Sequence, residues 1–195
     1  NGEKVNNTNK AATYTRIEKL WKEGDVVQVE FPMKIQLTEW KENKNSVSVN
    51  YGPLTFSLKI KEEYKKENSK TSATSDSRWQ ASADASKWPS YEIYPASNWN
   101  YGLLLNEKDT SKLFEVVKKP WPADDFPFSQ QNVPIELNAK GKIIPQWKID
   151  QYGLVDTLPP SPVAVNTKAE TIELIPMGAA RLRISAFPVV KTFNP

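Results

Sequence analysis

The sequence predicts an all-β fold, an antiparallel β-sandwich or jelly roll. Apolar and polar residues alternate with period two over much of the chain, and turn residues separate the alternating runs. No apolar stripe with helical spacing extends beyond about two turns. Fifteen prolines against seven glycines in 195 residues also favour short strands that are joined by rigid connections.

The first four strand candidates lie in the first third of the chain. Apolar side chains occupy every second position in residues 27–31, 33–37, 47–51 and 54–60. Half-buried antiparallel strands show this alternation, with their apolar side chains facing the core. Turn residues stand where hairpins need them, at Glu23-Gly24-Asp25, Asn43-Lys44-Asn45 and Gly52-Pro53.

Shorter candidates follow in the rest of the chain. They are residues 91–93, 103–105, 113–117, 133–137, 143–149, 172–174 and 182–184, with a turn signal at Lys140-Gly141. Pro145 lacks the amide hydrogen that a ladder needs. Residues 143–149 are therefore expected to form an edge strand or to contain a bulge.

Two stretches of different composition divide the chain. Residues 67–90 are rich in Ser, Ala, Thr and Lys, which predicts an exposed connection with one helical turn over residues 81–87. Pro159-Pro160-Ser161-Pro162 is a second junction. The interpretation is a first β-sandwich of residues 1–66 plus 171–195, with a second β-sandwich of residues 67–170 inserted into it.

Each predicted sandwich has its own expected core. The first core comprises Trp21, Phe31, Met33, Val49, Phe56, Leu58, Leu174, Leu182 and Ile184. The second core comprises Ile93, Trp99, Tyr101, Ile135, Leu137 and Trp147.

Composition excludes several classes of chemistry. The chain has neither cysteine nor histidine, so it holds no disulfide, thiol nucleophile, imidazole base or Cys/His zinc site. The net charge of +3 is spread thinly, which argues against a nucleic-acid partner. No apolar run approaches the roughly 20 residues that span a bilayer. We expect no cofactor and no metal site.

Carboxylates are the main acid–base groups that remain. Glu62-Glu63 and Asp124-Asp125 are adjacent pairs, but sequence neighbours in a strand or loop point in different directions. No spacing places two carboxylates across a cleft, as glycoside hydrolysis requires. We therefore assign no catalytic residue to this chain and interpret these groups as solvated surface charge.

Tryptophan is the one feature above background, with seven in the chain. Aromatic faces bind sugar rings through apolar contact, and the indole N–H donates a hydrogen bond. The candidates for sugar stacking are those expected in or near loops: Trp79, Trp88, Trp99 and Trp121. The alternative for each is that it closes one end of a sandwich core.

Four segments, in order, resemble the β-L-arabinofuranosidase-like enzymes of glycoside hydrolase family 127. Trp21-Lys22-Glu23-Gly24-Asp25-Val26 followed by Phe31-Pro32-Met33 resembles that family's W-x-x-G-D stretch and the (L/F)-P-M that follows it. Tyr51-Gly52-Pro53-Leu54-Thr55-Phe56 is similar to its G-P-L strand. The other two matches are Tyr91-Glu92-Ile93-Tyr94-Pro95 with Trp99-Asn100-Tyr101-Gly102-Leu103, and Leu174-Ile175-Pro176-Met177-Gly178.

The resemblance implies that this chain is the C-terminal β-sandwich region of a secreted or periplasmic glycoside hydrolase. In that family an (α/α)₆ barrel carries the catalytic groups, and no residue here matches them. The barrel of the same parent protein would be the partner, with a plant-type oligosaccharide as ligand. Asn1-Gly2 resembles a turn within the family's first sandwich, so that sandwich is expected to lack strands. A homodimer, or Asn1 to Leu20 folding back, would cover the gap.

Two other functions stay open at this point. One is an independent carbohydrate-binding module, in which at least two of the tryptophan rings form an exposed stacking platform. The other is a stand-alone hydrolase that works through carboxylates.

Overall fold

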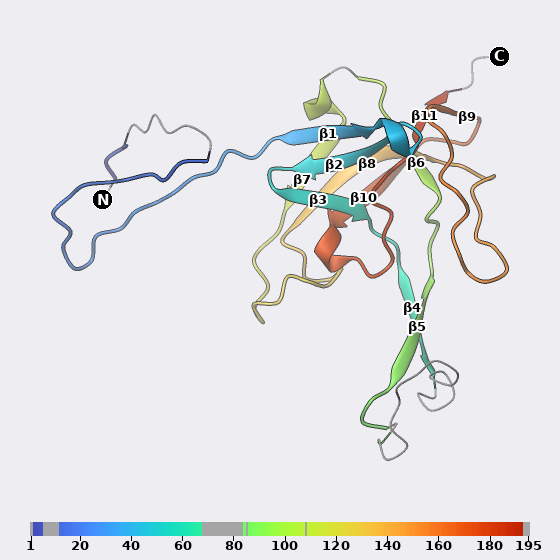
Figure 1. Ribbon diagram of the computed structural model, residues 1–195, viewed down its shortest axis with the longest axis horizontal. Coiled ribbons are helices and arrows are strands. Elements are labelled where there is room, and N and C mark those ends of the chain that lie inside the picture. Colours follow the sequence, from blue (N-terminus) through green and yellow to red (C-terminus); the bar gives the residue numbers. More distant parts are fainter. Residues whose placement is uncertain (1, 6–11, 68–83, 85, 108, 193–195) are drawn as a thin grey trace. The chain divides into compact units, whose positions relative to one another are not determined.

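The structure is a computed structural model that describes residues 2–5, 12–67, 84, 86–107 and 109–192. The chain divides into two compact units, Asn1–Pro32 and Met33–Pro195, and the helices and strands among the described residues lie in the second unit (Figure 1). The predicted all-β class is confirmed, because the described helices are three short 3₁₀ turns. These turns are η1 (Lys41–Asn43), η2 (Thr110–Lys112) and η3 (Met177–Ala179).

The described strands form one large sheet and one small sheet. Sheet A has nine strands: β1 (Ile35–Trp40), β2 (Ser46–Tyr51), β3 (Leu54–Leu58), β6 (Tyr101–Leu104), β7 (Phe114–Lys118), β8 (Ile135–Ile143), β9 (Val163–Val165), β10 (Glu170–Pro176) and β11 (Val189–Thr192). Sheet B pairs β4 (Glu62–Glu67) with β5 (Ser90–Pro95).

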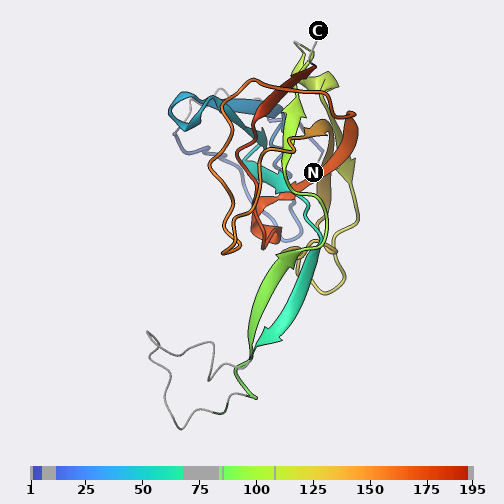
Figure 2. The ribbon, with the colours of Figure 1, turned by 90° about the vertical axis from the view of Figure 1, so that its right-hand side faces the viewer.

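Sheet A runs in the order β1-β2-β3-β10-β8-β6-β11-β9, and β7 also pairs with β8. Its ladders are antiparallel except those of β11, which runs parallel to β6 and β9. Val47 and Phe187 exchange both backbone hydrogen bonds, so the segment before β11 returns to β2. The sheet therefore curls around its own inner face (Figure 2).

The inner face of the curled sheet holds the main core. Period two places alternate residues of each strand on this face, as in β8, where Leu137 and Ala139 are buried in the core and Glu136 and Asn138 face outward. The other buried members of the cluster are Val49, Phe56, Leu58, Ile60, Tyr101, Leu103, Phe114, Ile172, Leu174 and Phe187.

The hairpin turn between β2 and β3 shows why the predicted turn residues stand where they do. Tyr51 pairs with Leu54, which leaves Gly52-Pro53 as a two-residue loop. Gly52 has φ +56°, and a Cβ at this position would lie 2.9 Å from the Cε of Met33. Only glycine meets both the backbone and the packing requirement.

Sheet B is a two-stranded ribbon whose base joins sheet A (Figure 2). Glu62 pairs with Pro95 at the base and Glu67 with Ser90 at the far end. Two aromatic residues of this ribbon pack on each other: Tyr64 and Tyr91 lie edge to face at 6.3 Å. Lys65 covers the ring of Tyr94 at 4.4 Å.

The unit Asn1–Pro32 contains the predicted turn at Glu23-Gly24-Asp25, and this turn is confirmed. The amide of Asp25 donates to the carbonyl of Lys22 at 3.1 Å, and the amide of Lys22 donates to the Asp25 carboxylate at 3.0 Å. Gly24 has the positive φ of +84° that such a turn needs. Residues 26–31 follow the turn without forming a strand, which corrects the prediction for residues 27–31.

Most of the other predicted strands are present, with three corrections. β8 runs through Lys140-Gly141, where a turn was predicted, because residues 137–141 pair continuously with β10. The same strand ends at Ile143, so Pro145 lies outside the ladder rather than in an edge strand. Residues 182–184 form no strand, although the carbonyl of Ile184 accepts a hydrogen bond from the amide of Leu58.

Sheet A crosses the limits predicted for the two domains. β10, from the predicted first sandwich, lies between β3 and β8, and β8 belongs to the range 67–170. Residues from both expected cores meet in the main cluster, among them Val49, Phe56, Leu137 and Leu174. Trp21 and Phe31 of the expected first core are instead exposed. The predicted helical turn at residues 81–87 falls largely outside the described residues.

Candidate functional site

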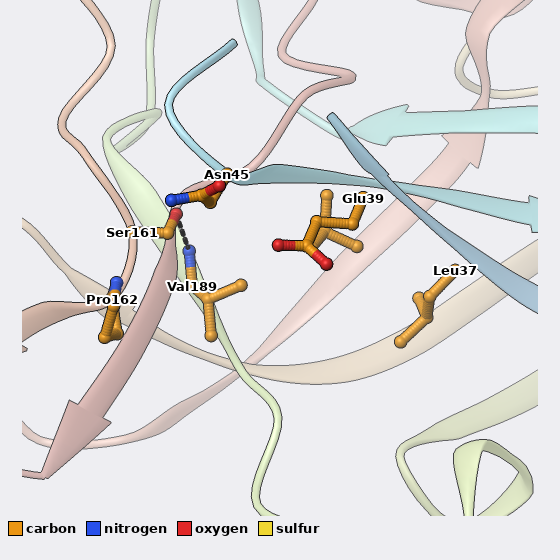
Figure 3. Close-up of a pocket in the computed structure, with 7 residues that line it drawn as sticks. Leu37, Glu39, Asn45, Ser161, Pro162 and Val189 are labelled. Atoms are coloured by element: carbon orange, nitrogen blue, oxygen red, sulfur yellow. Dashed lines mark hydrogen bonds between the residues drawn. The ribbon is translucent and has the colours of Figure 1, made fainter. Parts of the chain in front are cut away.

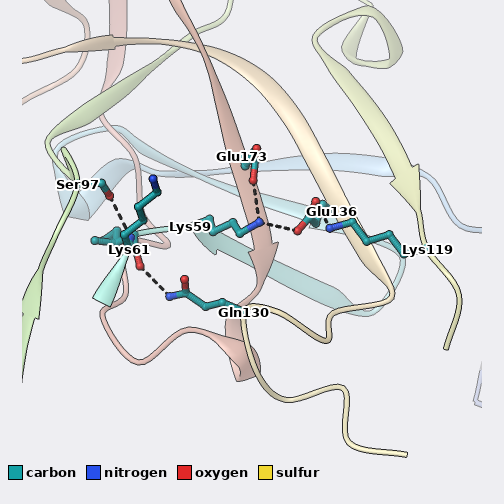
Figure 4. A network of polar contacts seen from close by, with 8 residues as sticks. Lys59, Lys61, Ser97, Lys119, Gln130, Glu136 and Glu173 are labelled. Carbon is teal, nitrogen blue, oxygen red and sulfur yellow. Dashed lines mark hydrogen bonds and ion pairs between the residues drawn. The ribbon is translucent and has the colours of Figure 1, made fainter. Parts of the chain in front are cut away.

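A buried carboxylate on the outer face of sheet A organises the main polar network (Figure 4). Glu136 of β8 has a side chain only 7% exposed and accepts ion pairs on both oxygens, from Lys59 at 2.9 Å and from Lys119 at 2.6 Å. Lys59 also bonds Glu173 of β10 at 2.8 Å. The network thus joins β8 and β10 to the residues that follow β3 and β7.

The charged states of this network stabilise one another. Burial raises the pKa of Glu136, but the hydrogen bonds from Lys119 and Lys59 outweigh it and leave the pKa below its usual value. Burial likewise lowers the pKa of Lys59, and the bonds to Glu173 and Glu136 reverse this, so the net pKa is raised. A general acid needs a pKa that is matched to proton transfer, and these shifts favour the permanent ion pair instead.

A second carboxylate, Glu62, fixes the base of the hairpin. One of its oxygens accepts from the Nε2 of Gln130 at 2.8 Å and from the backbone amides of Arg181 at 3.0 Å and Leu182 at 3.4 Å. The other accepts from the Tyr64 hydroxyl at 2.7 Å. Because donors surround it, this carboxylate acts as a structural tie between β4 and two loops.

A cavity of about 400 Å³ lies at this hairpin base. Residues at the start of β4, in the loop before β8 and at the end of η3 and just after it line the cavity: Lys61, Glu62, Tyr64, Phe128, Ser129, Gln130, Gln131, Ala179 and Arg181. Gln130 is buried and donates to the carbonyl of Ile60 at 2.7 Å, as Figure 4 shows, so the loop is held against the strand.

A wider and shallower cavity of about 540 Å³ opens beside β1 (Figure 3). Leu37, Val47, Pro162 and Val189 supply apolar contacts, while Glu39, Asn45 and Ser161 supply polar groups. The Ser161 hydroxyl accepts a hydrogen bond from the amide of Val189 at 2.9 Å. No sequence pattern marks either cavity, because each is lined by residues far apart in the chain.

The structure places the four predicted tryptophans in different settings. Trp99 lies against the core and meets Trp147 edge to face at 5.1 Å, as its alternative interpretation expects. Trp88 is exposed two residues before β5, and Trp121 is exposed in the loop after β7, where its Nε1 donates to Asp125 at 2.6 Å. Trp79 lies outside the described residues. Stacking of sugar on these rings stays a prediction.

The other predicted charge pairs take structural places. Asp124 accepts from the amide of Phe126 and from the side chain of Asn132, so it orders its own loop. Asp125 receives the bond from Trp121. Within the described part of the chain, no three His, Cys, Asp or Glu residues cluster in a way that could hold a metal ion.

Comparisons with protein-family models, with curated proteins and with solved structures gave no match. Among the described helices, none has the length and apolar character needed to cross a membrane.

Proposed function

We propose that this chain is a non-catalytic β-sandwich region of a larger glycoside hydrolase that resembles the β-L-arabinofuranosidases. Its role is to support a catalytic (α/α)₆ barrel in the same polypeptide. The proposal combines the resemblance of four sequence segments with one structural observation on the unit Asn1–Pro32.

That observation is a segment without regular secondary structure whose apolar side chains are exposed. Val29 is 67% exposed and Phe31 is 80% exposed, and Leu20, Trp21 and Val27 are exposed as well. Several large apolar side chains exposed within one short segment favour a surface that packs on another polypeptide. The same stretch carries the W-x-x-G-D and F-P-M segments of the resemblance, so the exposed side chains belong to a part of the chain that resembles the proposed parent enzyme.

The carboxylates support a structural role for the folded part. Glu136 accepts ion pairs from two lysines, and Glu62 accepts hydrogen bonds from four donors, so both connect strands to loops. Each bond that they accept reduces their capacity to transfer a proton to or from a substrate. The chemistry of a parent hydrolase would therefore lie in its barrel.

Hydrogen exchange tests the proposed interface. The amides of residues 20–31 should exchange fast in the isolated chain and slowly in the longer polypeptide that carries the barrel. Val29→Asp and Phe31→Asp should restore fast exchange in the longer polypeptide and leave the melting temperature of the isolated chain unchanged. Tyr152→Asp is the matched control, since Tyr152 is an exposed apolar residue elsewhere.

Two results would contradict the proposal. Release of arabinose from an arabinofuranoside by the purified chain alone would make the chain itself the catalyst. Protection of residues 20–31 in the isolated chain, together with a dimer in solution scattering, would make a second copy the occupant of this face.

A carbohydrate-binding module is the second candidate, because the described tryptophans Trp88 and Trp121 are both exposed. Titration with neutral arabinan oligosaccharides, followed by tryptophan fluorescence, tests it. A change in fluorescence on addition of sugar would favour this function if Trp121→Ala or Trp88→Ala abolishes that change. If the fluorescence of the unaltered chain stays constant at millimolar sugar, the supporting role is the better account.

A further inference from the structure

We propose that the cavity at the base of the β4–β5 hairpin binds an anionic saccharide, an oligosaccharide whose sugar rings carry carboxylates. The cavity is the 400 Å³ space between β4, the loop before β8 and the segment after η3. This inference concerns ligand binding and does not depend on the barrel, so either proposal can fail alone.

The charge of the cavity selects an anion. Lys61 and Arg181 both line it, and neither side chain forms an ion pair with a carboxylate in the described part of the chain. Glu62 is the negative group present, and four donors already occupy its oxygens. A carboxylate on the ligand would pair with the guanidinium and the ammonium without competing for those donors.

The position of Arg181 is fixed from two sides. Its backbone amide bonds the Glu62 carboxylate at 3.0 Å. Its guanidinium lies close enough to the Tyr64 hydroxyl to oppose the rise in pKa that the hydrogen bond to Glu62 causes there. Arg181 also lines the cavity and is exposed, so its guanidinium is available to an anion bound there.

Aromatic side chains on two segments favour a sugar over a small inorganic anion. Tyr64 and Phe128 both line the cavity, and each is held by an edge-to-face partner, Tyr91 at 6.3 Å and Phe126 at 5.5 Å. Rings held in this way offer the apolar face on which a pyranose packs. Gln131 and Ser129 add an amide and a hydroxyl for the sugar hydroxyls.

The walls of the cavity are assembled before any ligand arrives. Gln130 bonds the carbonyl of Ile60 at 2.7 Å and the carboxylate of Glu62 at 2.8 Å, which fixes the loop of Phe128 and Gln131 against β4. A site that is already ordered loses less conformational entropy on binding. Three segments distant in sequence thus contribute basic, aromatic and neutral polar residues to the lining of one space.

Calorimetric titration of the full chain with trigalacturonate tests the proposal, with galactotriose as the neutral match. We expect the acidic trimer to bind and the neutral trimer to bind at least tenfold more weakly. Arg181→Gln and Lys61→Gln should each weaken the binding of trigalacturonate about tenfold, since each removes a charge-assisted contact. Lys118→Gln, which removes an exposed cation at the end of β7, should leave the affinity unchanged.

Two further measurements separate binding at this site from general attraction of anions. Phe128→Ala should weaken the binding of trigalacturonate and leave any binding of acetate unchanged. Circular dichroism and melting of each variant establish that it is folded. The proposal is overturned if trigalacturonate fails to bind at millimolar concentration, if galactotriose binds equally well, or if Lys118→Gln weakens binding as much as Arg181→Gln does.

Discussion

Two segments with the same alternating pattern have opposite fates in this molecule. β3 (Leu54–Leu58) and residues 27–31 both place apolar side chains at every second position. In β3 these side chains reach the core, and Phe56 is 0% exposed. Residues 26–31 form no strand, and their Phe31 is 80% exposed.

Neighbouring strands account for the difference. β3 lies between β2 and β10, so both of its edges are paired and its inner side chains face a closed layer. Alternation decides which side chains share a face, whereas partners distant in the sequence decide whether that face is covered. The hairpin of sheet B is intermediate, because its strands pair with each other and lack a covering layer.

In this comparison, truncation of a core side chain is expected to have the largest effect on stability. Phe56→Ala should lower the free energy of unfolding by about 3–5 kcal/mol, because it leaves a cavity in the main cluster. Phe31→Ala makes the same chemical change in solvent and should cost less than about 0.5 kcal/mol. Urea unfolding of the isolated chain measures both, and equal losses would show that residues 26–31 are buried in solution.

A second contrast compares two glutamates that bond the same lysine. Glu136→Gln should cost about 2–3 kcal/mol, because it removes a buried charge and leaves Lys59 and Lys119 without their shared partner. Glu173 is 51% exposed, so Glu173→Gln should cost less than about 1 kcal/mol. Urea unfolding measures both losses. If Glu173→Gln loses more free energy of unfolding than Glu136→Gln, Glu173 contributes more to stability than Glu136 does, which contradicts this prediction.

The turn between β2 and β3 gives a smaller effect. Gly52→Ala should destabilise the chain by about 1–2 kcal/mol, since alanine is strained at φ +56° and its Cβ would meet Met33. Pro53→Ala at the neighbouring position is the control and should change stability by less than about 1 kcal/mol. Thermal melting of the two variants checks the ranking.

The smallest expected effect is a dependence on pH. The pKa of Glu136 is lowered in the folded chain, so its contribution to stability is present at neutral pH and is lost as the pH falls through the folded pKa. The pKa of Lys59 is raised, so its contribution is lost only as the pH rises through its own folded pKa. Between neutral pH and pH 3, wild type should therefore lose more stability than Glu136→Gln does, and parallel pH profiles would contradict this.

Local chemistry made most of the strands predictable. The alternation in β2, β3 and β8 is visible in the sequence, and the turns at Gly24 and Gly52 follow from the backbone freedom of glycine. β9 was missed because Ser161-Pro162 directly before it was interpreted as a junction. β11 was missed because its ladders are parallel and join strands distant in sequence.

Neither the charge network nor the cavity at the hairpin base was predictable in the same way. Nothing in the sequence distinguishes Lys59, Lys119 and Glu136 from other surface charges. The pairing of β3, β10, β8 and β7 brings both lysines within 3 Å of the Glu136 carboxylate. Arg181 and Phe128 carry no motif. Their meeting at β4 depends on loop contacts such as Gln130 with Ile60.

The sequence by itself determined the β class, the faces of most strands and the absence of thiol and imidazole chemistry, because these depend on residue type and on neighbours two positions away. Only the tertiary structure decided that β3, β10 and β8 share one sheet, and which carboxylates are buried. Strand pairing joins residues across long stretches of chain, and no local pattern specifies which edges meet.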